Sequence, residues 1–187
     1  MKKFALFAFA AAFLFAGAPV AAYAAGLFGT DQPTAGQTAP TFSLPSQDGT
    51  PVSLDSFKGK WVVLYFYPKD MTQGCTIEAH KFQEDLPKYD AANAVILGVS
   101  VDTVDSHKQF CTKDSLTFHL LADPDHKVVD SYGSFGLKIP QRENVIPVAQ
   151  RNTFLIDPSG KIAKVWIGVD PSHSSEEVLA ALAELKK

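Results

Sequence analysis

Two cysteines, at positions 75 and 111, have the clearest capacity for chemistry in this 187-residue chain. Cys75 follows the loop Pro68-Lys-Asp-Met-Thr-Gln-Gly74, where a helix is expected to begin. Free backbone N–H groups in the first turn of a helix carry partial positive charge, which favours the nucleophilic thiolate. Thr72 adds a hydroxyl to the same place, and Gly74 lets the backbone approach closely. These residues favour a reactive thiol at Cys75, with a plain structural disulfide as the alternative.

The segments on either side of Cys75 predict how the thiol is placed. Residues 61–67 form a continuous apolar run of aromatic and β-branched residues, which is typical of a strand buried on both faces. Residues 75–90 carry one inward stripe at spacings of three and four, which predicts an amphipathic helix: Cys75, Glu78, Ala79, Phe82, Leu86 and Tyr89. In open α/β sheets, sites form at the carboxyl ends of strands. The loop before Cys75 is therefore the expected site.

The rest of the pattern predicts an α/β protein with a thioredoxin-like fold. Buried strands that alternate with helices indicate a parallel part of the sheet, and a late hairpin adds antiparallel strands. The result is a mixed central sheet with helices on both faces and an N-terminal β-hairpin. The predicted elements are a hairpin (41–44 and 51–54), a strand (94–101), a helix capped by Asp102 (to about 113), a strand (119–122), a short helix (125–132), a loop (133–150), a hairpin (152–157 and 161–167) and a last helix with a Ser174–Glu177 capping box.

The first 24 residues resemble a secretory signal peptide. A basic start, Met1-Lys-Lys3, precedes an apolar run over residues 4–20, and Ala22-Tyr-Ala24 offers a cleavage site between small residues. An uncleaved membrane anchor is the alternative. The apolar run contains a glycine and a proline, however, and it is shorter than the roughly 20 residues that a membrane span needs. The pattern therefore predicts export, with the periplasm as the expected location.

The remaining chain suits one exported domain. We expect a loose leader over residues 25–38, rich in Gly, Thr, Gln and Pro, and a single domain over residues 39–187. Hydrophobic residues make up 46% of the chain, which is enough for a full core. The net charge of -3 gives no reason to expect a nucleic-acid partner, and no later stretch predicts stable membrane insertion.

Three features in order resemble the peroxiredoxin family. Residues 68–75, PKDMTQGC, match P-x-x-x-T-x-x-C, the active-site signature of peroxiredoxins. The longer stretch YFYPKDMTQGCTIEA is similar to the subfamily called peroxiredoxin Q or bacterioferritin comigratory protein. Residues 151–157, RNTFLID, resemble the family's strand R-x-T-F-L-I-D. The order of elements agrees over roughly residues 38–185, in a fold of the same class.

The resemblance implies a role for each residue around the thiol. Cys75 would be the peroxidatic cysteine, which attacks hydrogen peroxide or an organic hydroperoxide and becomes a sulfenic acid. Arg151 would stabilise the thiolate and the developing negative oxygen, while Thr72 and the Cys75 N–H would hydrogen-bond the peroxide. Pro68 would shield the thiolate. Glu78 would orient these groups, although a glutamate near a helix N-terminus is favourable on the surface too. No metal, haem or flavin cofactor is implied.

The resemblance also suggests how the oxidised thiol is resolved. Many members of the subfamily carry a resolving cysteine five residues after the first, where this chain has His80. Another branch carries it in the helix after the second central strand, and the position of Cys111 resembles that branch. An intrasubunit Cys75–Cys111 disulfide would follow, with the helix ends around both cysteines unwinding and a thioredoxin-type dithiol as the reductant. The expected oligomeric state is a monomer. On its residues alone, Cys111 also fits an ordinary buried cysteine, in a stripe with Val104 and His107.

Two other functions fit the predicted fold. A periplasmic thiol–disulfide oxidoreductase would share the fold, but it normally needs C-x-x-C at the helix start, and Cys75 is followed by Thr, Ile and Glu. A non-catalytic binding module with a structural disulfide is the second alternative. It would consume no peroxide and would not depend on Arg151.

Overall fold

The computed structural model of the chain describes residues 32–138 and 145–187. The predicted signal peptide over residues 1–24 lies outside this part, as do the first residues of the predicted leader. The described end of the leader is not loose, because the Gly36 N–H donates to the Ile162 carbonyl at 2.8 Å and the Ile162 N–H donates to the Gln37 carbonyl at 2.9 Å. These bonds satisfy backbone groups at the start of an edge strand. No helix within the described ranges is long and apolar enough to cross a membrane.

Strands and helices alternate through the first two thirds of the described chain, as the hydrophobic pattern predicts. In chain order the elements are β1 (Ser43–Pro45), β2 (Pro51–Ser53), a short 3-10 helix η2 (Leu54–Phe57), β3 (Trp61–Phe66), α1 (Gln73–Ala91), β4 (Ala94–Ser100), α2 (Val104–Asp114), β5 (His119–Ala122), α3 (Lys127–Ser131), β6 (Phe135–Lys138), β7 (Val145–Ala149), β8 (Asn152–Ile156), β9 (Ile162–Ile167) and α4 (Ser174–Leu185).

The central sheet is mixed and has the strand order β5-β4-β3-β8-β9. Strands β3, β4 and β5 are parallel, whereas β8 is antiparallel to β3 and β9 is antiparallel to β8. Phe66, the last residue of β3, pairs with Val99 near the end of β4 and with Asn152 at the start of β8. The carboxyl ends of β3 and β4 and the amino end of β8 therefore meet at one edge, where a site is expected.

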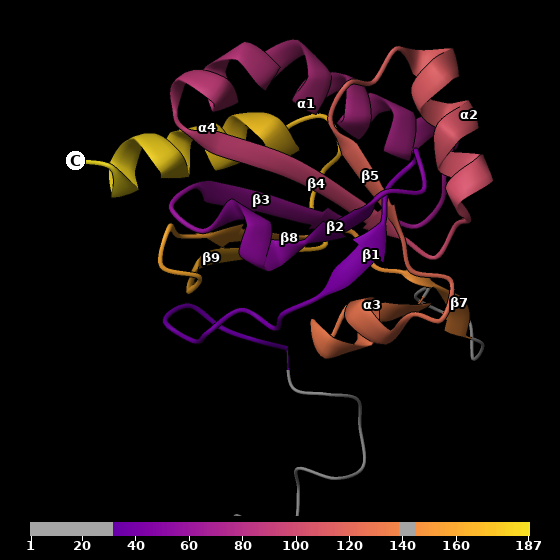
Figure 1. The fold of residues 1–187 in the computed structure, drawn as a ribbon, viewed down its shortest axis with the longest axis horizontal. Helices are drawn as coiled ribbons and strands as arrows, with labels where there is room; N and C mark the ends of the chain where they lie inside the picture. Colours follow the sequence, from indigo (N-terminus) through magenta and orange to yellow (C-terminus); the bar gives the residue numbers. More distant parts are fainter. Residues whose placement is uncertain (1–31, 139–144) are drawn as a thin grey trace, which may run out of the picture.

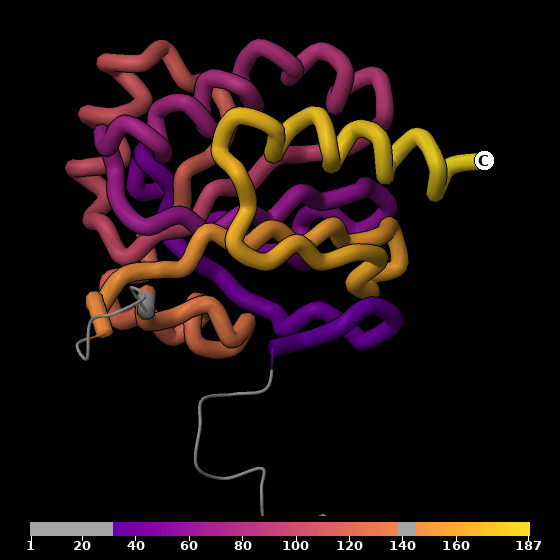
Figure 2. The backbone as a smooth tube through the Cα atoms, turned by 180° about the vertical axis from the view of Figure 1, so that it is seen from behind, coloured from indigo at the N-terminus to yellow at the C-terminus, as the bar shows by residue number. Residues whose placement is uncertain are grey.

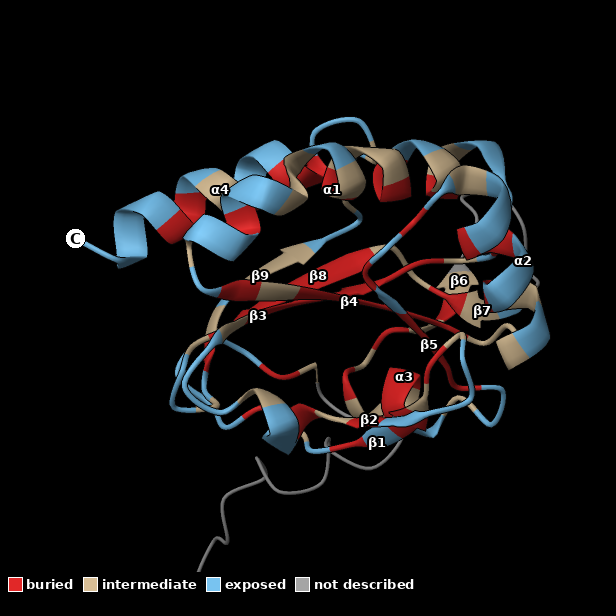
Figure 3. Ribbon diagram, turned by 45° about the horizontal axis from the view of Figure 1, so that its top comes forward, coloured by how far each residue is buried: buried red, intermediate tan, exposed pale blue. Residues whose placement is uncertain are grey.

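Helices cover both faces of the sheet. Helices α1 and α4 lie side by side over one face, together with α2, while α3 and the β1–β2 hairpin lie on the opposite side (Figures 1 and 2). Each long helix turns buried residues toward the sheet and exposed residues outward (Figure 3). This architecture, with its N-terminal hairpin, confirms the predicted α/β class with a mixed sheet.

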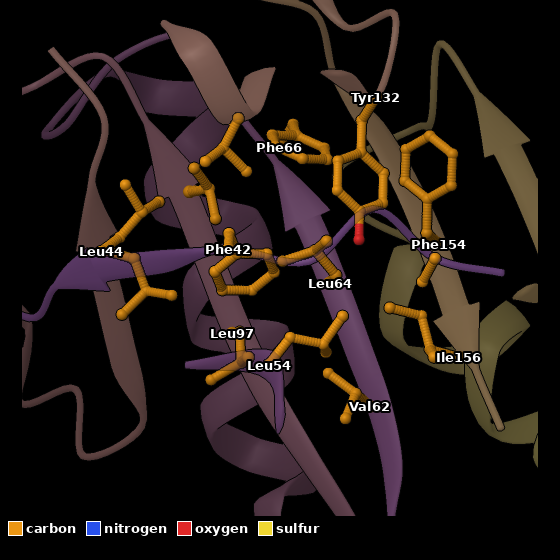
Figure 4. Close-up of a cluster of buried hydrophobic side chains, with 14 of the residues drawn as sticks. Phe42, Leu44, Leu54, Val62, Leu64, Phe66, Leu97, Tyr132, Phe154 and Ile156 are labelled. Carbon is orange, nitrogen blue, oxygen red and sulfur yellow. The ribbon is translucent and has the colours of Figure 1, made fainter. Parts of the chain in front are cut away.

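Strand β3 lies between two hydrophobic clusters, one on each face of the sheet. Leu64, Phe66 and Phe154 belong to the cluster beneath α3, where the Phe66 and Phe154 rings meet edge to face at 5.8 Å (Figure 4). Tyr65 and Phe82 belong to the cluster beneath α1 and α2, and their rings stack at 4.8 Å. Alternate residues of β3 thus fill both cores, which is why the strand reads as a continuous apolar run.

The predicted loop over residues 133–150 contains two strands in its described parts, residues 133–138 and 145–150. Strands β6 and β7 form an antiparallel hairpin there, with an irregular register between Phe135 and Leu137. Gly136, in a left-handed conformation at φ 84°, and Pro147 interrupt the pattern that normally marks a strand. These two short strands pair only with each other among the described strands, so their burial is weak and periodicity does not reveal them.

Two predicted helix caps are also wrong. Thr103, not Asp102, caps α2, and its hydroxyl accepts the Ser106 N–H at 3.3 Å. Asp102 instead accepts the Ser100 hydroxyl at 2.7 Å. Ser174 is already the first helical residue of α4, behind a His173 cap with helical backbone angles, so the predicted Ser174–Glu177 capping box does not form. In both places, the residue next to the expected one takes the capping position.

Candidate active site

The register of the sheet brings Arg151 to the thiol. Strand β3 ends at Phe66, the chain passes through residues 67–72, and α1 begins at Gln73, so Cys75 lies in the first turn of the helix as predicted. Because Asn152 pairs with Phe66, the residue before it stands at the carboxyl end of β3. Two residues separated by 76 positions in the chain therefore become neighbours.

Arg151 links Cys75 to Glu78. Its Nη2 donates a hydrogen bond to Cys75 Sγ at 3.3 Å, and its Nη1 forms an ion pair with Glu78 Oε2. Glu78 is completely buried, Cys75 is 2% exposed, and the Arg151 side chain is 16% exposed. The planar guanidinium can make both contacts at once because its donors form a rigid fork. The structure thus brings together three of the residues that the sequence singled out.

Burial sets the electrostatics of this trio. Loss of solvent raises the pKa of the Glu78 carboxyl above its ordinary value, although the Arg151 charge opposes the shift. Burial by itself lowers the pKa of Arg151, but the charges of Glu78 and Cys75 outweigh it, so the pKa of the guanidinium is raised. Arg151 therefore remains a cation, hydrogen-bonded to the sulfur in a partly desolvated site where such bonds are strong.

Pro68 and Thr72 lie in the turn between β3 and α1, and Gly74 directly precedes Cys75 in the first turn of α1. Thr72 is the capping residue of α1, but its hydroxyl makes no capping bond and donates instead to the Lys69 carbonyl at 3.0 Å. Since its proton is used there, the lone pairs of this exposed oxygen are available to accept from a ligand. Pro68 is half-buried at the start of the same turn. A Cβ at Gly74 would lie 3.2 Å from Arg151 Nη2, so the glycine makes room for the arginine.

Cys111 lies in the second half of α2 and is 8% exposed. It shares the hydrophobic cluster beneath α1 and α2 with Cys75, and both thiols are free. Burial, and then the charges of Asp70 and Asp48, raise the pKa of Cys111 to about 12. In this conformation Cys111 is a poor nucleophile, because the thiolate is the reactive form. Because both thiols are free, the predicted Cys75–Cys111 disulfide is not formed in the state described.

His80, at the position of the other resolving cysteine, points toward the end of α2. Its Nε2 lies 3.1 Å from Asp114 Oδ1, the carboxylate of the last residue of that helix. Among the residues that the structure describes, no group of three or more His, Cys, Asp or Glu side chains could hold a metal ion.

Sequence reasoning missed a buried polar cluster next to the catalytic loop. Tyr67, Asp70 and His107 are 1%, 4% and 0% exposed, and they hydrogen-bond one another. The sequence placed His107 in one stripe with Val104 and Cys111 but indicated no role for it. A usable signal was present, because His107 lies on the buried stripe of its helix, and a buried polar side chain there requires a partner.

Fold and site together define a class of protein. A single buried thiol in the first turn of a helix, hydrogen-bonded by an arginine and lying at the edge of a mixed sheet, is the arrangement of a thioredoxin-like thiol peroxidase. The profile of the AhpC/TSA family matches residues 35–165. The chain belongs to this family and is a peroxiredoxin similar to the Bcp, or peroxiredoxin Q, group.

Individual relatives support this assignment. The chain is 39% identical over 152 residues to peroxiredoxin Bcp of Bacillus subtilis. The aligned part covers 81% of this chain and 96% of the relative. It is 43% identical over 153 residues to a putative peroxiredoxin bcp of Coxiella burnetii, covering 79% and 97%. The bacterioferritin comigratory protein of Xanthomonas campestris has a similar structure, with a TM-score of 0.75, 34% identity and coverage of 84% and 99%. These neighbours confirm the predicted thioredoxin-like peroxiredoxin fold.

The Xanthomonas campestris protein offers two further observations. Its structure is presented in terms of alkyl peroxide reduction activity and a trapped intermediate. Solved structures named Xanthomonas campestris peroxiredoxin Q, 34% identical to this chain, include two mutants in which one or the other of two cysteines, 36 positions apart, is replaced by serine. Cys75 and Cys111 have the same separation.

Proposed function

We propose that this peroxiredoxin reduces hydrogen peroxide and organic hydroperoxides through Cys75, and that Cys111 resolves the oxidised cysteine within the same subunit. The observation that carries the first part is the fork of Arg151, which contacts the Cys75 sulfur and the buried Glu78 carboxylate together. Alkyl peroxide reduction in the Xanthomonas campestris relative supports the substrate class.

The peroxide step follows from the contacts around the sulfur. The Cys75 thiolate attacks one peroxide oxygen, the O–O bond breaks, and the other oxygen takes a proton and departs as water or alcohol. Arg151 stabilises the thiolate before the attack and the negative oxygen as it develops. The Thr72 oxygen accepts a hydrogen bond from the peroxide, while Glu78 fixes the guanidinium and Pro68 borders the thiolate. The product is a Cys75 sulfenic acid.

Resolution requires Cys111 to move. A Cys111 thiolate attacks the sulfenic sulfur, the sulfenic oxygen leaves as water, and a Cys75–Cys111 disulfide forms; a thioredoxin-type dithiol then returns both thiols. The raised pKa and burial of Cys111 make it unreactive while α2 is intact. The first turns near Cys75 and the end of α2 therefore unwind during turnover. The matching separation of the two mutated cysteines in the Xanthomonas campestris protein supports this assignment.

The proposal also includes the location of the enzyme, the periplasm, and its oligomeric state, a monomer. The basic, apolar and small-residue pattern of residues 1–24 supports export to the periplasm. A disulfide within one subunit needs no partner subunit, so the protein can work as a monomer.

Peroxide consumption by the wild type, Cys75→Ser and Cys111→Ser, with thioredoxin as the reductant, tests the proposal. Cys75→Ser should show no turnover. Cys111→Ser should oxidise Cys75 once at the wild-type rate but form no intrasubunit disulfide, as mass spectrometry would show. Activity in Cys75→Ser would refute the peroxidase assignment. Full thioredoxin-dependent turnover in Cys111→Ser would refute the role of Cys111 and leave a one-cysteine enzyme.

A further inference from the structure

The turn that leads into α1 contains part of the buried polar cluster of Tyr67, Asp70 and His107, which the peroxide chemistry does not use. Asp70 is 4% exposed, and its carboxylate accepts three hydrogen bonds. Tyr67 donates to Oδ1 at 2.7 Å, while the Ser106 hydroxyl and His107 Nδ1 contact Oδ2 at 2.7 and 2.8 Å. The Asp70 backbone N–H donates to Asp102 Oδ2 at 2.9 Å.

These bonds connect the catalytic loop to the helix that carries Cys111. Asp70 lies in the turn between β3 and α1, two residues before Thr72. Asp102 follows β4, and Ser106 and His107 lie in the first turn of α2. The cluster therefore fastens the Thr72 loop to the amino end of α2, where the helix begins and not where Cys111 lies.

The loop needs such an attachment because its conformation is strained. Met71, between Asp70 and Thr72, has a left-handed backbone with φ 56°. This conformation costs a residue other than glycine about 1–2 kcal/mol. The Met71 side chain is 40% exposed, and the Thr72 hydroxyl bonds only within its own turn, to Lys69. Among the described residues of this turn, Asp70 and Tyr67 make the side-chain hydrogen bonds that reach α2: Asp70 contacts Ser106 and His107, and the Tyr67 hydroxyl lies 3.3 Å from His107 Nδ1.

The protonation of the cluster suits a permanent anchor. Burial alone raises the pKa of Asp70, but the bonds from His107, Ser106 and Tyr67 outweigh it and the pKa is lowered. Asp70 is therefore a carboxylate, and hydrogen bonds to an ionised group are roughly twice as strong as neutral ones. His107 Nε2 is buried and has no partner among the described residues. A proton on Nδ1 lets the ring donate to Asp70 and leaves only an acceptor unpaired.

We propose that Asp70 is a positioning residue for peroxide reduction, because its carboxylate holds the Thr72 hydroxyl in place by fastening the loop to the first turn of α2. The inference rests on the proposed peroxidase function and adds to it a residue that touches neither the thiol nor the peroxide. The attachment also divides α2 into two parts. The first turn is bound to the loop, while the end with Cys111 lies outside this attachment.

Two reagents separate positioning from general damage at the site. Peroxide needs the Thr72 oxygen, whereas iodoacetamide alkylates the Cys75 thiolate without it. In a Cys111→Ser parent, Asp70→Asn should slow Cys75 oxidation by about tenfold or more, because small misplacements of a binding group are costly. Its alkylation rate should stay at the parent value. Ser106→Ala, which removes one of the three bonds, should give a smaller loss of the same kind.

Asp105→Asn is the matched control. Asp105 is exposed in the same first turn of α2, so this change removes an equal charge from the helix start without touching the loop. It should leave both rates unchanged. Thr72→Val provides the decisive coupling test, since Asp70→Asn should slow peroxide reduction much less in a Thr72→Val background than in the parent.

The outcomes are separable. A parent that reacts with peroxide, together with an Asp70→Asn variant that reacts equally fast, would overturn this inference alone. So would equal losses in peroxide reduction and alkylation, or fully additive effects of Asp70→Asn and Thr72→Val. A parent that does not react with peroxide at all would overturn the proposed function, and this inference with it.

Discussion

At the scale of single residues, Arg151 is central to the site because its guanidinium contacts two acidic groups at once, the Cys75 thiol and the Glu78 carboxyl. One guanidinium nitrogen contacts Glu78 and another contacts the Cys75 sulfur. The Glu78 side chain is completely buried, and leaving such a charge unpaired is expensive. The carboxylate therefore holds the arginine in the orientation that the thiolate needs, and Gly74 leaves the space for it.

Replacing Arg151 with Lys tests whether geometry or charge matters. The variant keeps a positive charge, but a single ammonium cannot reproduce the planar fork that reaches both partners. We expect the rate of Cys75 oxidation by peroxide to fall on the order of 10²-fold. Stopped-flow measurement under single-turnover conditions gives this rate, and thermal unfolding checks that the variant is folded. An unchanged rate would mean that net charge alone activates the thiol.

The residues that sequence could predict at the site are those held by local rules. Thr72, Gly74 and Cys75 occupy fixed places in a loop and a first helical turn, and Arg151 follows from the motif of its strand. Asp70 and His107 belong to different elements, 37 positions apart, and their contact depends on how α2 packs beside the loop. No spacing rule covers such a pair, so only the folded chain reveals it.

At the scale of elements, α2 is built to be stable at one end and labile at the other. Thr103 caps its start, and its first turn is bound to Asp70. Its last turn carries Cys111 and ends at Ser115, which adopts a left-handed conformation with φ 54°. Helix α2 is only 11 residues long, and the terminal turns of a helix open more easily than the core of a protein.

The raised pKa of Cys111 gives a pH-dependent measurement of this closed state. In a Cys75→Ser variant at pH 8, alkylation of folded Cys111 should be about 10³-fold slower than in urea, since a pKa of about 12 replaces the ordinary 9.0. The ratio should shrink above pH 9, where only the folded thiol is still gaining thiolate. By linkage, folding stability from this thiol is full below pH 9 and is lost as pH rises toward 12. Equal rates at pH 8 would contradict a closed α2.

The sequence could predict the long elements better than the short ones. Helix α1 and strands β3 and β4 carry long periodic or apolar stretches, and each was predicted to within a few residues. Strands β6 and β7 were missed because Gly136 and Pro147 are unusual within strands and interrupt the strand pattern of the sequence. The two strands also pair mainly with each other, so their burial is weak. Caps were misplaced by one residue, because Asp102 and Thr103 are both good capping residues and tertiary contacts decide between them.

At the scale of the whole molecule, strands β3 and β4 are so tightly packed that a single methyl group has no room. Tyr65 pairs with Gly98, and the end of its ring lies over that glycine. A Cβ there would be 2.7 Å from the Tyr65 hydroxyl and 2.7 Å from Leu120 Cδ2. The fold class could be read from the sequence, but this contact depends on the register between the strands, which the sequence did not supply.

Gly98→Ala should therefore destabilise the protein by about 1–3 kcal/mol, the usual cost of overpacking a core. Urea unfolding followed by circular dichroism measures the change. Tyr65→Phe should recover part of the loss in the double variant, because it removes a contacting hydroxyl that has no hydrogen-bond partner among the described residues. Full stability in Gly98→Ala would show that the two strands can separate more easily than their burial suggests.

The contact between His80 and Asp114 has an evolutionary meaning. Position 80 is where many members of the resembled subfamily carry the resolving cysteine, and its side chain here lies against the last residue of the helix that holds Cys111. Position 80 thus contacts α2 one helical turn beyond Cys111. Both positions that could carry a resolving sulfur therefore lie on α1 and α2, and neither lies in the central sheet or in the loop before Cys75.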